Sequence, residues 1–426
     1  MMQESFLHFV WQHQYFDKTG LCASDGQPVN IIRPGFHNMN SGPDFGEATI
    51  KIGELDWRGS VEIHSRSSDW NVHGHTKDKA YDNVILHVVW EDDAQVLRND
   101  GTEIPTLTLS DRVDPALVKK YRQLINHTSD IPCEGYIRQV NELLIQSMLD
   151  STAMERLYQK SEEAGMLSER NGNDWEETTY QLFCKNFGFK TNADQFMRLA
   201  ELVPFRILKK HSNNLQQIEA LLFGQAGFLE EGSRDAYSNE LLKEFTFLHH
   251  KYQLKEPLSR HQWKFMRLRP ANFPTLRIAQ LAGILSDPSG LFSRAVEVKS
   301  KKQLLHIFKK GVGNYWKMHY QFGREATADV SLIGAGSIEN IGINTVAPVL
   351  IAYGKSIDDQ GYVDQAVALL QELATENNKI TRTLKKCGIV TRTAFESQGA
   401  IQLYNHYCLK KRCLSCKIGV DIIRRP

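Results

Sequence analysis

Two acidic residues, Asp44 and Glu62, occupy positions from which they can share a metal ion. Asp44 stands at the start of one strand-like segment, and Glu62 lies in the next, in the alternating run Gly59 to His64. Because side chains alternate along a strand, carboxylates on adjacent strands can point the same way and bind a hard divalent cation. Such an ion activates water and neutralises phosphate charge. The pattern predicts a metal-dependent nuclease.

Each acidic residue also has a purely structural interpretation. Asp44 follows Pro43, where an aspartate often fixes a turn by bonding its own backbone. Glu62 and His64 share one strand face, and both are ordinary surface residues if water covers that face. If a helix covers it instead, an unpaired carboxylate costs several kcal/mol and needs a metal or another cation.

Further histidines follow within a short stretch. His73 and His75 are one residue apart, so on an extended segment they face the same side and can ligate a transition metal. His87, inside the apolar run Val84 to Trp90, either joins them or is a hydrogen-bonded core histidine. These residues support a second hypothesis, a cupin-like metalloenzyme that acts on a small molecule.

The order of these motifs resembles the PD-(D/E)xK nuclease superfamily. An initial helix and strands are followed by Pro43-Asp44 and, 18 positions after Asp44, by Glu62-Ile63-His64. The resemblance implies a restriction-endonuclease-like fold in which Asp44, Glu62 and the Ile63 carbonyl bind Mg2+ or Mn2+. His64 replaces the usual lysine, and a neutral imidazole lacks a fixed positive charge. A third hypothesis is therefore a non-catalytic nucleic-acid-binding protein that kept the fold.

Four of the seven cysteines lie in the last forty residues. Cys387, Cys408, Cys413 and Cys416 form the pattern C-x20-C-x4-C-x2-C. Thiolates at such spacing can hold Zn2+ or an iron-sulfur cluster, and some nucleases of the same superfamily carry a four-cysteine cluster. Free thiols packed at a helix end are the alternative.

Two groups of basic residues are candidates for nucleic-acid contact. Lys410, Lys411 and Arg412 lie among the late cysteines, where a solvated tail is the simpler explanation. Lys264, Arg267 and Arg269 alternate with aromatic residues, as in proteins that bind single strands. At helical spacing such aromatics are more often part of a core.

The periodicity changes along the chain from that of strands to that of helices. After a helix at residues 4–16, strands are predicted at 28–33, 48–52, 55–63, 84–90 and 104–109, in a mixed sheet. From about residue 114 the apolar period is helical, with one helix starting at Asn173-Asp174 and ending near Gly188. We therefore predict an α+β protein with three parts: a nuclease-like α/β domain at 1–115, a larger irregular helical domain at 116–380, and a helical, cysteine-rich segment at 381–426.

Composition restricts the class of protein further. Residues 1–115 carry 9 Lys and Arg against 18 Asp and Glu, so the remainder is strongly basic in compensation. This division suits a metal-handling part joined to one that attracts a polyanion, or two parts that attract each other. No apolar run approaches the ~18 residues of a membrane span, no secretion signal opens the chain, and the cysteine number is odd. We expect a cytoplasmic protein with no membrane partner; its oligomeric state is open.

The whole chain also resembles a bacterial family known only as a domain of unknown function. The resemblance rests on Ser41 to Phe45, Gly59 to His64 with Ser68 to Trp70, and Tyr81 to Trp90. It continues in the later stretches Ala220 to Leu229 and Arg267 to Pro274. This family brings no established activity, so the function depends on the residues above.

Overall fold

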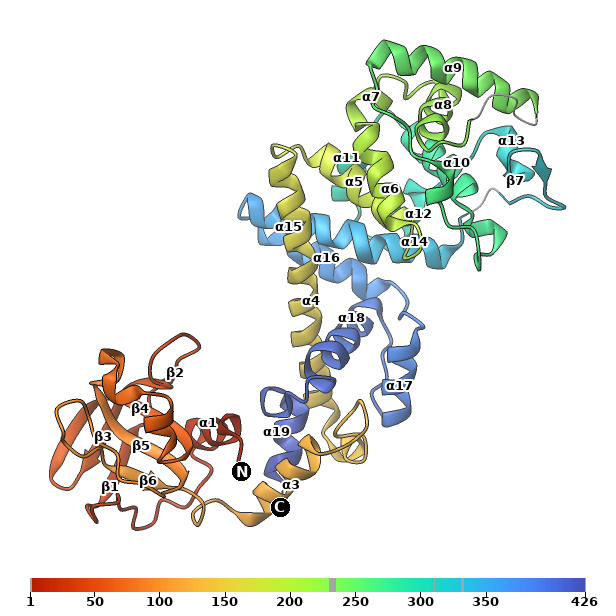
Figure 1. Cartoon of the computed structure of the whole chain (residues 1–426). Coiled ribbons are helices and arrows are strands. Elements are labelled where there is room, and N and C mark those ends of the chain that lie inside the picture. The colour runs from red at the N-terminus through yellow and green to blue at the C-terminus, as the bar shows by residue number, and fades with distance from the viewer. Residues whose placement is uncertain (1, 230–234, 310, 331–332, 426) are drawn as a thin grey trace. The chain divides into compact units, whose positions relative to one another are not determined.

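The computed structural model describes residues 2–229, 235–309, 311–330 and 333–425, which fold into two compact units (Figure 1). Unit 1 consists of the chain up to Met148 together with the segment from Tyr404 onward, and unit 2 consists of Leu149–Leu403. The fold is α+β, with a mixed sheet in unit 1 and mostly helices elsewhere. None of the helices in these described ranges has the length and apolar character that a bilayer crossing requires.

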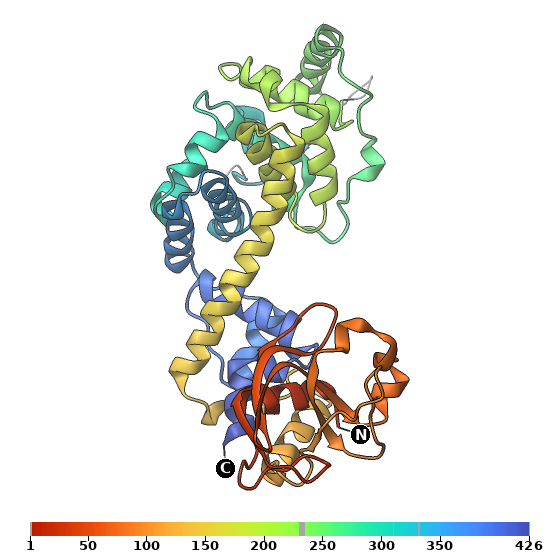
Figure 2. The same ribbon diagram turned by 90° about the vertical axis from the view of Figure 1, so that its left-hand side faces the viewer.

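The sheet of unit 1 is curled and combines antiparallel and parallel pairs (Figures 1 and 2). Its path is β1-β3-β4-β5-β6, and β2 pairs with β3 beside that path. The pairs β1-β3, β2-β3 and β3-β4 are antiparallel, whereas β4-β5 and β5-β6 are parallel, so the predicted mixed sheet is confirmed. The strands are β1 (Val29–Arg33), β2 (Phe36–His37), β3 (Phe45–Ile52), β4 (Leu55–Arg66), β5 (Val84–Glu91) and β6 (Thr106–Thr108).

The two central strands are buried on both faces over part of their length. In β5 the six residues from Val84 to Val89 are all buried, as expected for a strand between two parallel neighbours. In β4 the buried stretch runs from Val61 to Ser65. Helix α1 (Glu4–His13) contacts this strand, and the rings of His73 and His75 lie against His64 on the face that Glu62 shares. The face that carries Glu62 and His64 is therefore covered, and the solvated-face interpretation is wrong: these side chains are only 5% and 2% exposed.

An irregularity in β3 follows directly after Asp44. The register of the β3-β4 pair shifts between Phe45 and Ala48, and Glu47 adopts a left-handed φ of 56°. Such a bulge bends a strand and re-aims neighbouring side chains, and bulges are frequent beside functional sites. Here the bulge leaves Phe45 paired with Val61, so that Asp44 meets the next residues of β4.

A compact turn region follows β4 and is fixed by Ser67. The Ser67 hydroxyl accepts the backbone N–H groups of Asp93 and Ala94, each at 2.8 Å, and donates to Asp93 Oδ1 at 3.1 Å. The indole of Trp70, 1% exposed, donates to Thr76 Oγ1 at 3.0 Å. These bonds hold three short elements in place: α2 (Asp69–Val72), η1 (His75–Lys77) and η2 (Lys79–Tyr81).

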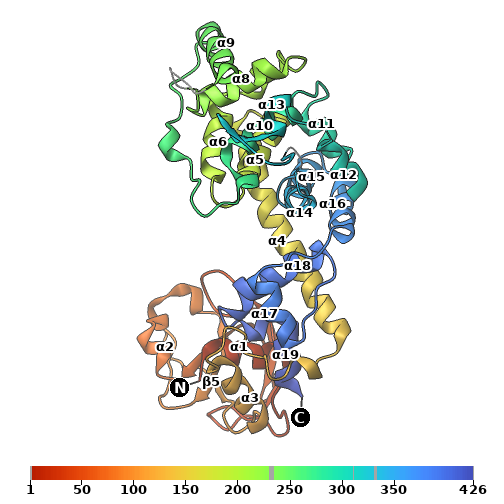
Figure 3. The ribbon, with the colours of Figure 1, turned by 90° about the vertical axis from the view of Figure 1, so that its right-hand side faces the viewer.

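The late part of the chain completes unit 1. Helix α19 (Lys417–Arg424) contacts α3 (Pro115–Ile125), as Figure 3 shows, and the short helix η8 (Cys413–Ser415) contacts α1. The hydroxyl of Tyr404 donates to Asp130 Oδ2 at 2.6 Å. The sheet-bearing unit therefore includes residues that the sequence separates by the whole of unit 2.

In its described ranges, unit 2 is mostly helical and contains a two-stranded ribbon of β7 (His319–Gln321) and β8 (Arg324–Glu325). Asp174 caps α5 by accepting the N–H groups of Glu176 and Glu177, which confirms the predicted helix start. Helix α10 is buried along its full length and lies in the main core. The helices are α4 (Glu142–Arg170, which begins in unit 1), α5 (Trp175–Phe187), α6 (Ala193–Leu202), α7 (Phe205–Lys209), α8 (Leu215–Gln225), α9 (Ala236–Tyr252), η4 (Arg260–Gln262), η5 (Pro270–Asn272), α10 (Pro274–Leu285), α11 (Leu291–Val296), α12 (Lys301–Ile307), α13 (Asn314–Lys317), α14 (Ala335–Ile341), the π-helix η6 (Gly342–Val346), α15 (Ala347–Ser356), α16 (Gln360–Glu372), α17 (Lys379–Cys387) and α18 (Ala394–Gln402), with the π-helix η7 (Leu403–Cys408) at the junction.

Candidate metal centre

Asp44 and Glu62 meet where β3 begins beside β4. The Asp44 N–H donates to Glu62 Oε2 at 3.0 Å, and the Ile63 N–H donates to Asp44 Oδ2 at 3.0 Å. Glu62 thus accepts a hydrogen bond from the backbone of Asp44, and Asp44 accepts one from the residue after Glu62. These two bonds hold both residues at the point where β3 begins beside β4.

The environment of Glu62 favours a bound cation. Burial, and then the negative charge of Asp44, raise the pKa of Glu62 to about 8. A buried carboxylate with a carboxylate neighbour is ionised readily only when positive charge is nearby. A divalent ion between Asp44 and Glu62 would supply that charge.

His64 stands where the resembling nucleases carry a lysine, and it is a neutral group here. Burial lowers its pKa to about 4, with further contributions from His75 and His73. Its Nδ1 lies 2.8 Å from His87 Nε2, and its Nε2 lies 3.1 Å from His73 Nδ1 and 3.6 Å from Glu62 Oε1. A neutral imidazole supplies a lone pair rather than a positive charge, so His64 is suited to ligating a metal.

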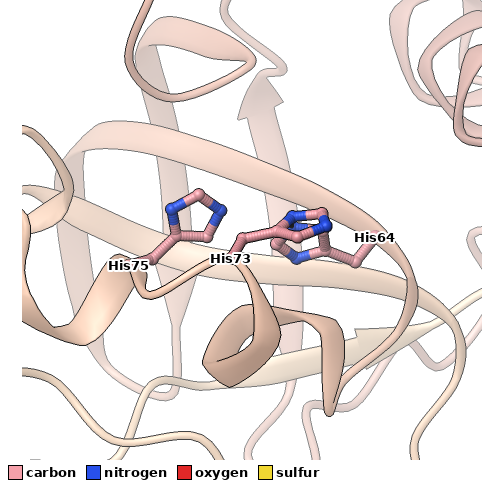
Figure 4. A group of neighbouring side chains, drawn as sticks. All are labelled: His64, His73 and His75. Atoms are coloured by element: carbon pink, nitrogen blue, oxygen red, sulfur yellow. Dashed lines mark hydrogen bonds between the residues drawn. The ribbon is translucent and has the colours of Figure 1, made fainter.

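His73 and His75 also converge on this point, although not from an extended segment. His73 ends α2 and His75 begins η1, with Gly74 between them at a φ of 75°, so the prediction of an extended segment is wrong. The turn nevertheless brings both rings to His64, and Figure 4 shows the three imidazoles beside one another. Their ring nitrogens lie within 4.8 Å of one another, and His75 Nε2 is 3.4 Å from Glu62 Oε1.

The surroundings of this histidine group hold its rings in position. The ring of His75 stacks on Tyr81, with centroids 3.8 Å apart, and meets the edge of Trp70 at 5.3 Å. His87 is fully buried, and burial holds its pKa well below the ordinary value. It contacts His64 rather than the common point of the three nitrogens, which matches its interpretation as a hydrogen-bonded core histidine.

Sequence reasoning missed two residues of the centre, both on α1. His8 Nε2 lies 3.2 Å from Asp44 Oδ2, and Glu4 is close enough to His73, Asp44 and His8 for their charges to affect its pKa, which burial raises. The available signal was their spacing: Glu4 and His8 are four residues apart and so share a helix face.

The predicted nucleic-acid contacts are at the surface. Lys264, Arg267 and Arg269 are exposed between η4 and η5, whereas the neighbouring Trp263 is buried in the core of unit 2. The exposed group at residues 410–412 belongs to unit 1, where Lys411 Nζ donates to the Ile125 carbonyl. Both groups remain candidates for phosphate contact.

The four late cysteines are divided between the units. Cys408, Cys413 and Cys416 are buried in unit 1, and Cys387 ends α17 in unit 2. Burial and the neighbouring Cys416 raise the pKa of Cys413 to about 12, which favours the thiol over the thiolate. Within the described ranges the three histidines alone form a group of three or more such ligands. The cysteine metal site remains a prediction.

A comparison with protein-family models places the chain in one family. The model of the family described as "Protein of unknown function (DUF2851)" matches residues 4–379, so the chain is a member of that family. The matched range includes every residue of the centre described above. No curated protein and no solved structure matches the chain.

Proposed function

We propose that this protein is a metal-dependent phosphodiesterase acting on nucleic acid, with a unit 1 of the PD-(D/E)xK type. The observation that carries the proposal is that the Glu62 carboxylate accepts the Asp44 N–H while the Asp44 carboxylate accepts the N–H of Ile63, the residue after Glu62. It is supported by the order of elements, because a helix and strands precede an aspartate at the start of one strand and Glu-x-His on the next.

The residues present fit Mg2+ or Mn2+. Asp44 and Glu62 supply the hard oxygen ligands, and the backbone of Ile63 lies against Asp44. An ion bound there would polarise the phosphate and lower the pKa of a bound water.

The neighbouring side chains have supporting roles. His8, at 3.2 Å from Asp44 Oδ2, orients that carboxylate. Tyr81 faces the same charges: burial, Glu62 and Asp44 raise its pKa to about 12, so its phenol keeps its proton and can donate to a phosphate oxygen. The exposed basic residues of both units offer contacts to the phosphate backbone, which position nucleic acid without reading its sequence.

The test uses the full chain with supercoiled plasmid, single-stranded DNA and RNA, with Mg2+ or Mn2+ present. We expect cleavage that chelation abolishes and that Glu62→Gln and Asp44→Asn each reduce at least a hundredfold. The matched control is Asp56→Asn, an exposed aspartate on the same strand as Glu62, which should cleave as the wild type does.

Two other outcomes would replace the proposal. Tight binding of nucleic acid without cleavage under any of these conditions would identify a binding protein. No binding and no cleavage would refute both nucleic-acid functions and favour a small-molecule metalloenzyme.

A further inference from the structure

The histidine group beside Glu62 has the dimensions of a metal site of its own. Zinc-nitrogen and zinc-oxygen bonds of about 2.1 Å in a tetrahedron place neighbouring ligand atoms about 3.4 Å apart. The separations are 3.1 Å from His64 Nε2 to His73 Nδ1, 3.6 Å from His64 Nε2 to Glu62 Oε1, and 3.4 Å from His75 Nε2 to Glu62 Oε1. The three histidine nitrogens, which lie within 4.8 Å of one another, are thus placed to share one small cation, and Glu62 Oε1 lies beside two of them.

Hydrogen bonding accounts for only part of this arrangement, namely the 3.1 Å contact of His64 Nε2 with His73 Nδ1. His75 Nε2 is buried and has no hydrogen-bond partner among the described residues, although Glu62 Oε1 is near it. Buried polar atoms are almost always paired, so an unpaired nitrogen facing other ligand atoms indicates a missing partner. A cation at their common point would satisfy all of these lone pairs.

His87 provides the outer support that a metal-bound histidine usually has. A ligating histidine donates its second ring N–H to a neighbouring acceptor, which fixes its tautomer and orientation. The 2.8 Å contact of His64 Nδ1 with His87 Nε2 allows this donation. His64 Nε2 is then free of a proton and directed at the group.

We propose that His64, His73 and His75, with Glu62 beside them, bind a transition-metal ion of the Zn2+ type, distinct from the Mg2+ or Mn2+ ion between Asp44 and Glu62. The ligand types separate the two sites, because imidazole suits zinc-like ions and carboxylate oxygen suits magnesium. Glu62 joins them: its Oε2 accepts the Asp44 N–H, while its Oε1 lies near His64 and His75. A hydrolytic role for this ion rests on the proposed function, but its binding does not.

The test is a titration of the metal-free, full-length protein with Co2+, which reports four-coordinate nitrogen ligation by strong visible absorption. We expect one equivalent to bind with that spectrum, Zn2+ to displace it, and millimolar Mg2+ to leave it unchanged. His73→Ala and His75→Ala should each lose the spectrum and weaken binding at least a hundredfold. His87→Phe should weaken it about 10–100-fold, the usual cost of an outer-shell change.

Two control variants separate this site from its neighbour and from the other histidines. Asp44→Asn should keep the Co2+ spectrum, and His261→Ala, an exposed histidine of unit 2, should bind as the wild type does. His73 is itself exposed, so its replacement is compatible with folding, which circular dichroism will check.

Wild-type Co2+ affinity in both His73→Ala and His75→Ala, or no four-coordinate spectrum in the wild type, would overturn the inference. Co2+ binding without nucleic-acid cleavage would reject only the proposed function, and Mg2+-dependent cleavage without Co2+ binding would reject only this site.

Discussion

Glu219 is a buried acid in unit 2 whose replacement should stabilise the protein in a pH-dependent way. Its side chain is 2% exposed, and burial raises its pKa to about 7. Tyr237 donates its hydroxyl to Oε2, while Oε1 has no hydrogen-bond partner among the described residues. The change Glu219→Gln keeps the shape and the acceptor for Tyr237 but removes the ionisable group.

The direction in which the free energy of unfolding changes with pH follows from the protonation of Glu219 in the folded and in the unfolded chain. Below pH 4.5 the carboxyl is protonated in both the folded and the unfolded chain, so ionisation of Glu219 costs nothing. Between pH 4.5 and about 7 the unfolded chain ionises first, and stability falls as the pH rises. Above pH 7 the folded state carries the full cost of ionising Glu219. For a folded pKa of about 7 and an unfolded pKa of 4.5, this cost is about 3 kcal/mol.

The measurement is the free energy of unfolding in urea at pH 4.5 and at pH 8.5, for the wild type and for Glu219→Gln. We expect the difference in free energy of unfolding between the variant and the wild type to be about 3 kcal/mol more favourable to the variant at pH 8.5 than at pH 4.5. Glu240→Gln, an exposed glutamate on α9, should show no such gain. A Glu219→Gln difference that stays constant with pH would refute the reasoning.

Three further predictions concern packing and metal binding. Gly224→Ala should destabilise unit 2 by about 1–3 kcal/mol in urea unfolding, because a Cβ there would lie 2.1 Å from Phe245 Cγ. The control Gly165→Ala has open space at its Cβ and should instead stabilise the protein by about 0.5–1 kcal/mol. Equal effects of the two changes would contradict the packing argument. Ser67→Ala removes the three hydrogen bonds described above and should lower the free energy of unfolding by about 2 kcal/mol in the same assay. Because the change loosens the turn region that carries His73 and His75, it should also weaken Co2+ binding. Unchanged Co2+ affinity would argue against a role of Ser67 in positioning these histidines. Zn2+ at a hundred times its Kd should stabilise the wild type by about 2.7 kcal/mol in calorimetry, whereas it should not stabilise the His64→Ala variant. An equal gain in both proteins would show that Zn2+ binds outside the histidine group.

The sequence predicts those features of the fold that local pattern determines. The continuous apolar run from Val84 to Val89 is a buried strand, and the Asp174 cap begins a helix as predicted. Further along the chain, α6 and α7 are separate helices, with Pro204 at the break between them. Proline lacks the N–H that a continuous helix would need at that point, so this boundary was also accessible to local reasoning.

The part of the centre that depends on tertiary structure was not predictable in the same way. Asp44 and Glu62 directly adjoin the last pair of β3 with β4, Phe45 with Val61, and the alternation of residues suggests that pairing. His8 reaches the centre from a helix that precedes β1, and His73 and His75 reach it through a left-handed turn at Gly74. No local periodicity encodes these approaches, because they depend on how α1 and the turn region pack on the sheet.

The participation of residues 404–425 in unit 1 has a consequence for biosynthesis. A ribosome delivers this segment only after it has translated all of unit 2, so α19 reaches α3 late in synthesis. A polypeptide that stops early would carry the acidic and histidine side chains without the helix that finishes their scaffold. Any activity of the centre that needs this scaffold would then depend on translation through α19.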